Sequence, residues 1–221
     1  MHYIQPPLPL LRGLIDPETQ SSDIALDVYC ADNFLLREFF WARLRMLTLL
    51  IRRFSTGDQR CLDFGGGSGI FMVSLASGFK RVDLIDLNTA QAERLQASYG
   101  IENVRITRAN VNAFDYGAGA FDAIVAADVL EHFKDLQLPI ERIRHWLSDG
   151  GTLYTSLPTE NLCYRVLRVL FGKQKPHDHY HTAAEVERFL RASGFRKVGG
   201  LYHPLFVPLF PLFRISAWKK H

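Results

Sequence analysis

Apolar residues recur with two different spacings along the chain, and each spacing predicts a type of element. Over 32–54 apolar residues return every three or four positions with arginines between them, which predicts one long helix or two shorter ones. Short, nearly continuous apolar runs follow, and such runs are typical of parallel strands buried on both faces. These strand candidates are 60–64, 82–87, 104–109, 121–128 and 152–157.

Helical patterns alternate with these strand candidates. They cover 70–77, 89–99 and 136–147, whereas only a loop or a single turn is expected between the third and fourth strands. Strands that alternate with helices predict right-handed crossovers and an α/β fold with a doubly wound, Rossmann-like sheet. A ligand crevice is then expected beyond the carboxyl ends of the strands, with helices on both faces of the sheet.

The C-terminal part follows a different pattern. A helix is predicted at 162–171, a polar loop at 172–181, a second helix at 182–193, and strands at 195–199 and 213–218. This last strand pair would complete a seven-stranded, mostly parallel sheet. We therefore expect a loose N-terminal lead-in over 1–22 and one domain over 23–221, with a helical segment at 32–54 and substrate-covering insertions at 159–181 and 201–212.

Composition narrows the class of protein. The chain has 221 residues, 48% hydrophobic and 22% charged, which suits one ordinary globular domain, and a net charge of +3 argues against a nucleic-acid surface. Three scattered cysteines without a CxxC pair favour a reducing, cytoplasmic location. No export signal is visible at the N-terminus, and prolines interrupt the apolar stretch 201–213, which is too short to span a bilayer.

A glycine-rich turn follows the first strand candidate. The residues run Asp63, Phe64, Gly65, Gly66, Gly67, Ser68 and Gly69. Glycines let a backbone turn sharply and approach a ligand without a Cβ in the way. The dinucleotide spacing would need its last glycine at Ile70, so a nicotinamide or flavin diphosphate is the weaker interpretation. A purely structural turn is the other alternative.

Polar residues also follow the second and third strand candidates. Asp86, with Leu87 beside it, could accept hydrogen bonds from both hydroxyls of a ribose, or else be a solvated loop residue or a helix cap. After the third strand, the amide of Asn110 could read an adenine edge while Val111 packs on its ring. Asn110 would equally suit a turn.

The fourth strand candidate leads into three titratable residues, Asp128, Glu131 and His132. Perturbed pKa values tend to collect at such places. His132 is the candidate general base, with a structural histidine as the alternative. Three further candidates lie in the polar loop, which could fold over the crevice: His177, His179 and His181.

The residues that follow the first four strand candidates, taken in order, resemble those of the class I S-adenosylmethionine-dependent methyltransferases. The resemblance is to the small-molecule branch that includes quinone and other O-methyltransferases. The resemblance covers about 60–158 and rests on motifs in register at 62–69 (LDFGGGSG), 121–125 (FDAIV), 129–132 (VLEH) and 147–153 (LSDGGTL). A less specific likeness continues at 181–187 and 193–195.

The resemblance implies S-adenosyl-L-methionine as the cofactor. The site residues it implies are Asp63, Gly65, Gly67 and Gly69 for the methionine part, Asp86 and Leu87 for the ribose side, Asn110 and Val111 for the adenine, and Asp128 for the amino group. Asn110 stands where the family usually has an aspartate. Some members of the quinone branch also bind a divalent metal, which here would fall on Asp128, Glu131 and His132; since the cofactor competes for Asp128, no metal is assigned.

The sequence therefore predicts methyl transfer to a small, lipophilic acceptor, with O-methylation assisted by His132. The apolar segments 162–171 and 201–213 suit a lipophilic substrate or peripheral contact with a membrane, and equally suit a core or a dimer contact. Two other functions stay open. One is a non-catalytic protein that binds the cofactor, and the other is a methyltransferase for protein or RNA that docks on the arginines of 32–54.

Overall fold

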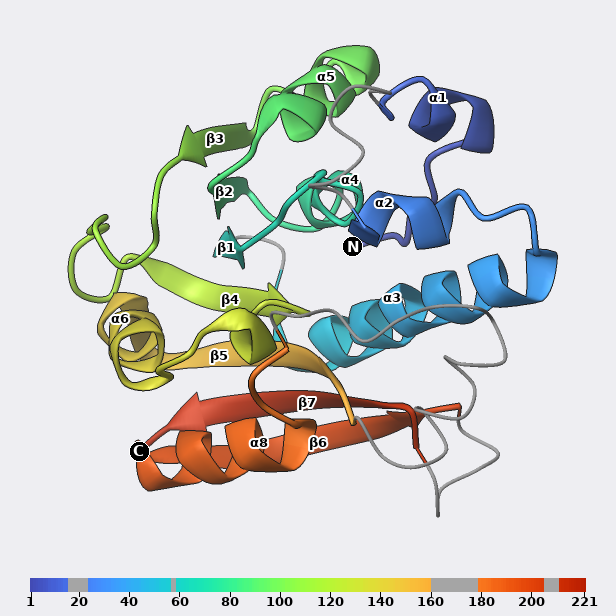
Figure 1. Ribbon diagram of the computed structural model, residues 1–221. Coiled ribbons are helices and arrows are strands. Elements are labelled where there is room, and N and C mark those ends of the chain that lie inside the picture. The colour runs from blue at the N-terminus through green and yellow to red at the C-terminus, as the bar shows by residue number, and fades with distance from the viewer. Residues whose placement is uncertain (16–23, 57–58, 160–178, 205–210) are drawn as a thin grey trace.

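The computed structural model describes residues 1–15, 24–56, 59–159, 179–204 and 211–221 (Figure 1). Its helices are α1 Leu8–Arg12, α2 Ile24–Tyr29, α3 Phe34–Phe54, α4 Met72–Ala76, α5 Ala90–Tyr99, α6 Gln137–Trp146 and α8 Ala183–Ala192, with a 3-10 turn η1 at Leu130–His132. Its strands are β1 Arg60–Phe64, β2 Arg81–Asp86, β3 Val104–Arg108, β4 Phe121–Ala127, β5 Leu147–Pro158, β6 Phe195–His203 and β7 Phe213–Lys220.

The strands form one seven-stranded sheet in the order β3-β2-β1-β4-β5-β7-β6. Neighbours from β3 to β5 are parallel, and β7 runs antiparallel to both β5 and β6. In register, Asp63 of β1 lies between Leu84 of β2 and Val125 of β4. The predicted Rossmann-like fold is confirmed. Strand order reverses direction between β1 and β4, which places the ligand crevice at their carboxyl ends.

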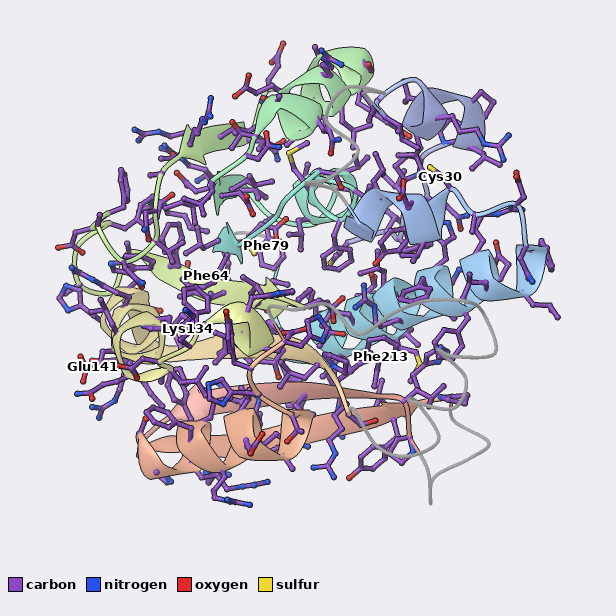
Figure 2. All side chains as sticks on the ribbon, viewed as in Figure 1. Cys30, Phe64, Phe79, Lys134, Glu141 and Phe213 are labelled. Carbon is purple, nitrogen blue, oxygen red and sulfur yellow. The ribbon has the colours of Figure 1, made fainter. Side chains whose placement is uncertain are left out.

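Helices cover both faces of the sheet, and alternate strand residues supply a core to each (Figure 1). On one face, α3, α4 and α5 pack against side chains such as Cys61 and Val125. On the other, α6 and α8 pack against Leu62 and Ile124. Figure 2 shows the resulting contrast between Phe64, inside the fold, and Glu141, at its outer edge.

The predicted elements between residues 32 and 158 match the observed ones closely. The long amphipathic segment is a single helix, α3, whose start is capped by the Asn33 side chain accepting from the Leu36 N–H at 3.1 Å. Only β5 differs appreciably, because it begins at Leu147 rather than at residue 152. The predicted helix 162–171 and most of the polar loop after it lie outside the described residues.

The N-terminal segment differs from its prediction. The sequence predicts a loose lead-in over 1–22, but residues 1–15 pack on the domain and include α1. Leu11 and Leu14 are buried. The N–H of Ile4 donates to Ser74 Oγ of α4 at 2.8 Å, and the N–H of His2 donates to Oγ of Ser77, the C-cap of α4, at 3.0 Å. Pro7 and Pro9 lie at the start of α1, where the first turn does not need their N–H groups, and they do not prevent this side-chain burial.

Candidate functional site

The glycine turn after β1 passes directly against the chain that leaves β4. Gly65 has φ of +71°, and a Cβ built on it would overlap the side chain of Val129. Its N–H donates to the carbonyl of Ile85 at 2.9 Å, which ties the turn to β2 as well. Since a side chain would be both strained and crowded here, glycine is required. The turn therefore joins the carboxyl ends of β1, β2 and β4.

Asp86 ends β2 and holds the same turn from the other side. Its Oδ2 accepts from the N–H of Gly67 at 2.9 Å and its Oδ1 from the N–H of Asn88 at 2.9 Å. Each carboxylate oxygen retains lone-pair capacity for a ligand hydroxyl. Leu87 beside it is 66% exposed, which leaves an apolar surface open next to the carboxylate.

Asp63 at the end of β1 is almost fully buried, with 3% of its surface exposed. Its Oδ2 has no hydrogen-bond partner among the described residues, and a Cβ on Gly66 would lie 2.8 Å from that oxygen. Burial, aided by the negative charge of Asp86, raises the pKa of Asp63 to about 7. A cationic group placed here would favour the ionised form.

Asn110 and Val111 leave β3 beside Asp86, because the N–H of Ala109 donates to the Asp86 carbonyl at 3.0 Å. Asn110 Oδ1 accepts from the N–H of Asn112 at 2.9 Å, so this oxygen serves a turn. Val111 is 8% exposed and packs in the same core cluster as Ile85. Both residues lie at the predicted rim, and the roles assigned to them there stay predictions.

Asp128 follows β4 in a left-handed conformation with φ of +53°, unusual for a residue other than glycine. Its N–H donates to the Ser156 carbonyl at 2.9 Å, and its carboxylate forms an ion pair with Arg43 of α3. Arg43 is not among the predicted site residues, because the arginines of 32–54 entered the prediction only as a docking face for protein or RNA. Helical spacing carried the signal, since position 43 lies on the same side as Phe40 and Leu47.

The turn η1 brings Glu131 and His132 to the rim of the crevice, where His179 joins them. The rings of His132 and His179 meet edge to face with centroids 4.7 Å apart. The N–H of Tyr180 donates to the Glu131 carbonyl at 2.8 Å, which fixes the returning chain beside η1. Of the other loop histidines, His181 has Nε2 3.3 Å from the Lys134 carbonyl, and His177 lies outside the described residues.

The divalent-metal set implied by the quinone branch is only partly assembled. Asp128 is paired with Arg43, whereas ligand atoms of Glu131, His132 and His179 lie within 4.8 Å of one another. Two imidazoles and one carboxylate could hold a transition metal ion. This group differs from the set that the resemblance implied, and no metal is assigned to it.

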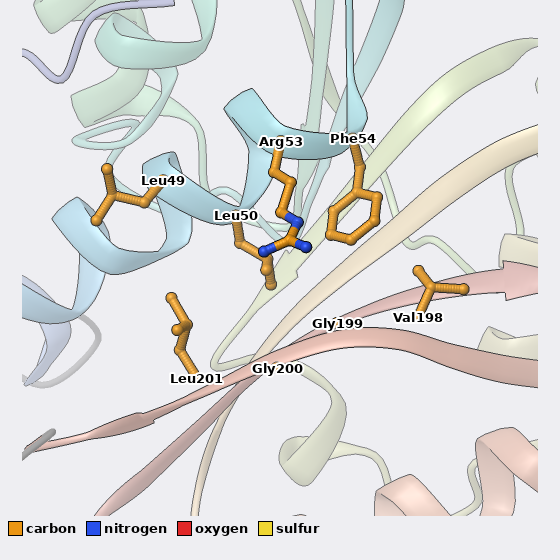
Figure 3. Close-up of a pocket in the computed structure, with 8 residues that line it drawn as sticks. All are labelled: Leu49, Leu50, Arg53, Phe54, Val198, Gly199, Gly200 and Leu201. Atoms are coloured by element: carbon orange, nitrogen blue, oxygen red, sulfur yellow. The ribbon is translucent and has the colours of Figure 1, made fainter.

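A separate apolar pocket lies between the C-terminal end of α3 and β6 (Figure 3). Its lining residues are Leu49, Leu50, Arg53, Phe54, Val198, Gly199, Gly200 and Leu201. A Cβ on Gly199 would lie 2.8 Å from the Phe54 ring, so the strand glycine allows α3 to pack closely there. None of the predicted cofactor residues lines this pocket, and the crevice at β1 and β4 remains the candidate site.

The crevice fits the cofactor that the motifs imply. The glycine turn forms a cradle that side chains would fill, and Asp63 presents a buried oxygen that has no hydrogen-bond partner among the described residues.

Membrane crossing is a separate question. Among the helices that the structure describes, none combines the length and the apolar character of a membrane span.

Comparison with known proteins agrees with this geometry. Residues 36–199 match the model of a family described as methyltransferase domain. Among curated proteins, (S)-coclaurine N-methyltransferase of Papaver somniferum is 27% identical over 63% of this chain and 40% of its own length. Ubiquinone biosynthesis O-methyltransferase of Burkholderia pseudomallei is 27% identical over 66% of this chain and 70% of its own. The chain thus spans less than half the length of the plant relative.

A solved structure with the same fold is N-methyltransferase NodS from Bradyrhizobium japonicum WM9 in complex with S-adenosylhomocysteine. It has a TM-score of 0.67 and 20% identity, with 96% of each chain covered. The fold is that of a Rossmann-like methyltransferase domain. The chain belongs to the methyltransferase domain family.

Proposed function

We propose that this protein transfers a methyl group from S-adenosylmethionine to a hydroxyl of a small, apolar acceptor, with His132 as the general base. The observation that carries the proposal is the position of His132 on η1, directly after the segment whose Val129 contacts the glycine turn. A base at this rim lies beside the cofactor cradle. His179 packs edge-on against its ring and limits the orientation of the imidazole.

The proposal gives a role to the cofactor and to each residue of the site. When bound, S-adenosylmethionine supplies an electrophilic methyl group on a sulfonium. Asp63 and Asp86 hold the ammonium and ribose hydroxyls, and the glycine turn lets the backbone approach. His132 would take the proton of the acceptor hydroxyl and pass it to solvent, and the cofactor, having supplied its methyl group, would leave as S-adenosylhomocysteine. Such proton removal is typically worth about 10²- to 10⁴-fold.

The acceptor's apolar character is proposed from the ring cluster beside the ion pair of Arg43 and Asp128. Phe39 packs on His203 with centroids 4.3 Å apart and on Phe213 at 5.9 Å. Burial and the nearby charge of Arg43 lower the pKa of His203 to about 4, so its ring is neutral at physiological pH. On this side an apolar acceptor would meet aromatic rings and a neutral imidazole, beside an Arg43 guanidinium whose charge is paired with Asp128. Contact with a membrane surface is a further proposal, testable by adding vesicles to the assay.

O-methylation and N-methylation differ in their need for a base. A hydroxyl is a weak nucleophile until its proton is removed, whereas a neutral amine attacks first and loses its proton afterwards. One relative is named for O-methylation and another for N-methylation, so acceptor type is not fixed by likeness. The histidines at the rim favour the hydroxyl.

The test is transfer of labelled methyl to matched pairs of small acceptors, each pair with a hydroxyl in one member and an amine in the other. His132→Gln should reduce transfer to hydroxyls by about 10²-fold or more. His145→Gln, on the exposed side of α6, should leave transfer unchanged. Transfer to amines alone, with no loss in His132→Gln, would overturn the proposal.

Two other outcomes would indicate other functions. Cofactor binding without transfer to any component of an extract would indicate a non-catalytic protein. Activity destroyed by nuclease or protease treatment of an extract would indicate RNA or protein acceptors.

A further inference from the structure

His203 is a buried histidine at the end of β6. It is 6% exposed, and its ring stacks on Phe39 of α3 with centroids 4.3 Å apart and lies 6.4 Å from the centre of the Phe213 ring. Its Nε2 is buried and has no hydrogen-bond partner among the described residues. A buried polar atom without a partner costs free energy, so its place among aromatic rings calls for a reason beyond packing.

The imidazole of His203 can accept a hydrogen bond at Nε2. Burial lowers the pKa of His203 to about 4, against a hydrogen bond to the Phe39 backbone that raises it, so the ring is neutral at physiological pH. A hydrogen bond that raises the pKa is one that the ring donates, and a neutral imidazole has a single N–H. The lone pair of Nε2 is therefore left unused. A nitrogen of such low basicity accepts a hydrogen bond but is a poor base.

The sheet places His203 at the edge where the crevice lies. Both β5 and β6 run antiparallel to β7, so β6 ends at the same edge as β4 and β5. In register, Pro158 of β5 and His203 of β6 lie opposite Phe213 of β7. The Phe213 ring centre lies 4.9 Å from the guanidinium carbon of Arg43, which pairs with Asp128 after β4. His203 therefore belongs to the rim of the crevice, on the side of α3.

His132 and His203 reach this rim from different faces of the sheet. The turn η1, which carries His132, packs through Leu130 into the core beneath α6 and α8. The ring of His203 packs on Phe39 of α3, which covers the opposite face. An acceptor whose reacting hydroxyl gives its proton to His132 thus meets Nε2 of His203 with another part of the molecule.

We propose that His203 binds a second, non-reacting hydroxyl of the acceptor by accepting its hydrogen bond at Nε2, while Phe39 and Phe213 pack on the apolar part of the acceptor. This rests on the proposed function, because it concerns the acceptor of the same reaction. The acceptor class becomes an apolar molecule with two hydroxyls. A site with a buried acceptor atom discriminates against a ligand that lacks the matching donor, because that atom is then left unpaired. His203 determines specificity in this way and takes no proton.

The alternative is a histidine that only fills the space between Phe39 and Phe213. The two roles differ in how they respond to the second hydroxyl of a ligand. A packing residue affects ligands with one hydroxyl and with two hydroxyls alike. A residue that accepts the hydrogen bond affects only ligands that carry the second hydroxyl.

The experiment is a calorimetric titration of the protein saturated with S-adenosylhomocysteine. The probes are alkylphenols and the matching benzenediols, in which the second hydroxyl takes each ring position in turn. For at least one position, the wild type should bind the diol about tenfold more tightly than the phenol. His203→Phe, which keeps a ring beside Phe39, should lose this preference by weakening the diol alone. His203→Gln, which keeps an acceptor oxygen, should retain part of it.

The matched control is Phe40→Leu in the same ring cluster. Phe40 has no polar side-chain atom, and its ring centroid lies 5.9 Å from that of Phe213. This variant should change the affinities for phenol and diol by the same factor. If His203→Phe fails to fold, His203→Leu takes its place with the same expected result.

Equal weakening of phenol and diol in His203→Phe would overturn the inference. A wild type that prefers no diol over its phenol, including one that binds neither, would overturn it as well. If the wild type does not bind S-adenosylhomocysteine, the proposed function fails. If it binds this compound and prefers a diol, and His203→Phe leaves the preference unchanged, only the inference about His203 fails.

Discussion

The backbone N–H of Gly67 donates to the Asp86 carboxylate at 2.9 Å, so one side chain links the glycine turn after β1 to the end of β2. The same carboxylate accepts from the N–H of Asn88. Asp86 thus orients the turn in the protein itself, before any ligand hydroxyl arrives. Its support of the turn can be measured separately from the ribose binding proposed for it.

Asp86→Ala should loosen the glycine turn in the protein without ligand. A charge-assisted hydrogen bond is worth about 1.5–3 kcal/mol, so amide exchange at Gly67 should speed up by about tenfold or more. The measurement is residue-resolved hydrogen exchange. Asp86→Asn, which keeps an acceptor oxygen, should show a smaller increase. Unchanged exchange at Gly67 in the alanine variant would mean that the turn is held by other contacts.

Asp63 should make stability fall as pH rises. Its pKa is about 7 in the folded protein and near 3.8 in an exposed carboxyl, so between these values the folded state binds more protons than the unfolded state. Stability from this group is therefore complete below pH about 4 and is lost as pH rises to about 7. The free energy of unfolding contributed by this group should differ by about 4 kcal/mol between the two ends of this pH range.

The check is denaturant unfolding of the wild type and of Asp63→Asn across this pH range, with Glu102→Gln, an exposed carboxyl, as the control. The free energy of unfolding of the wild type should decline relative to Asp63→Asn, and the control should follow the wild type. Parallel curves for the wild type and Asp63→Asn would show that Asp63 titrates normally. S-Adenosylhomocysteine should reduce the decline, because its ammonium favours the ionised carboxyl.

Gly65→Ala should be more damaging than alanine at another glycine with positive φ. Gly65 combines φ of +71° with crowding by Val129, whereas Gly100, which ends α5 at φ of +60°, has no other atom within 4 Å of a built Cβ. Gly100→Ala should therefore cost only the backbone strain, about 1 kcal/mol. Gly65→Ala should cost more in thermal unfolding and weaken cofactor binding. Equal costs at the two sites would contradict the close contact.

The Arg43 and Asp128 pair should show strong coupling in stability. Arg43→Met leaves Asp128 without its cation and should cost about 3 kcal/mol in the free energy of unfolding. Asp128→Asn in that background should restore part of the loss, because the unpaired charge is removed. A double-mutant cycle from urea unfolding measures the coupling. Additive effects of the two changes would mean that the pair contributes no net interaction.

Most of the fold was predictable because the strands are short apolar runs separated by glycines and charged turns. The boundaries of β1, β2, β3 and β4 fall within one residue of prediction, since buried parallel strands need apolar side chains on both faces. The packing of residues 1–15 was not predictable, because it depends on the hydroxyls of Ser74 and Ser77, which meet the segment only in the folded chain.

The candidate site divides in the same way. Asp63, Asp86 and the glycine turn were predictable, because a parallel sheet brings strand ends together at one edge. Arg43 and His179 come from distant parts of the sequence, and no local spacing links them to Asp128 or His132. Partners that meet only through tertiary packing leave at most a faint local signal, such as an arginine on the apolar side of a helix.

The most direct test of the whole account is calorimetric titration of the purified protein with S-adenosylhomocysteine, at a pH above 7 where Asp63 is ionised. The account predicts binding at one site per chain, competition by S-adenosylmethionine, and an affinity that falls at least tenfold in Asp86→Ala but not in Glu102→Ala. Absence of binding to the wild type, or equal affinity in Asp86→Ala, would contradict it.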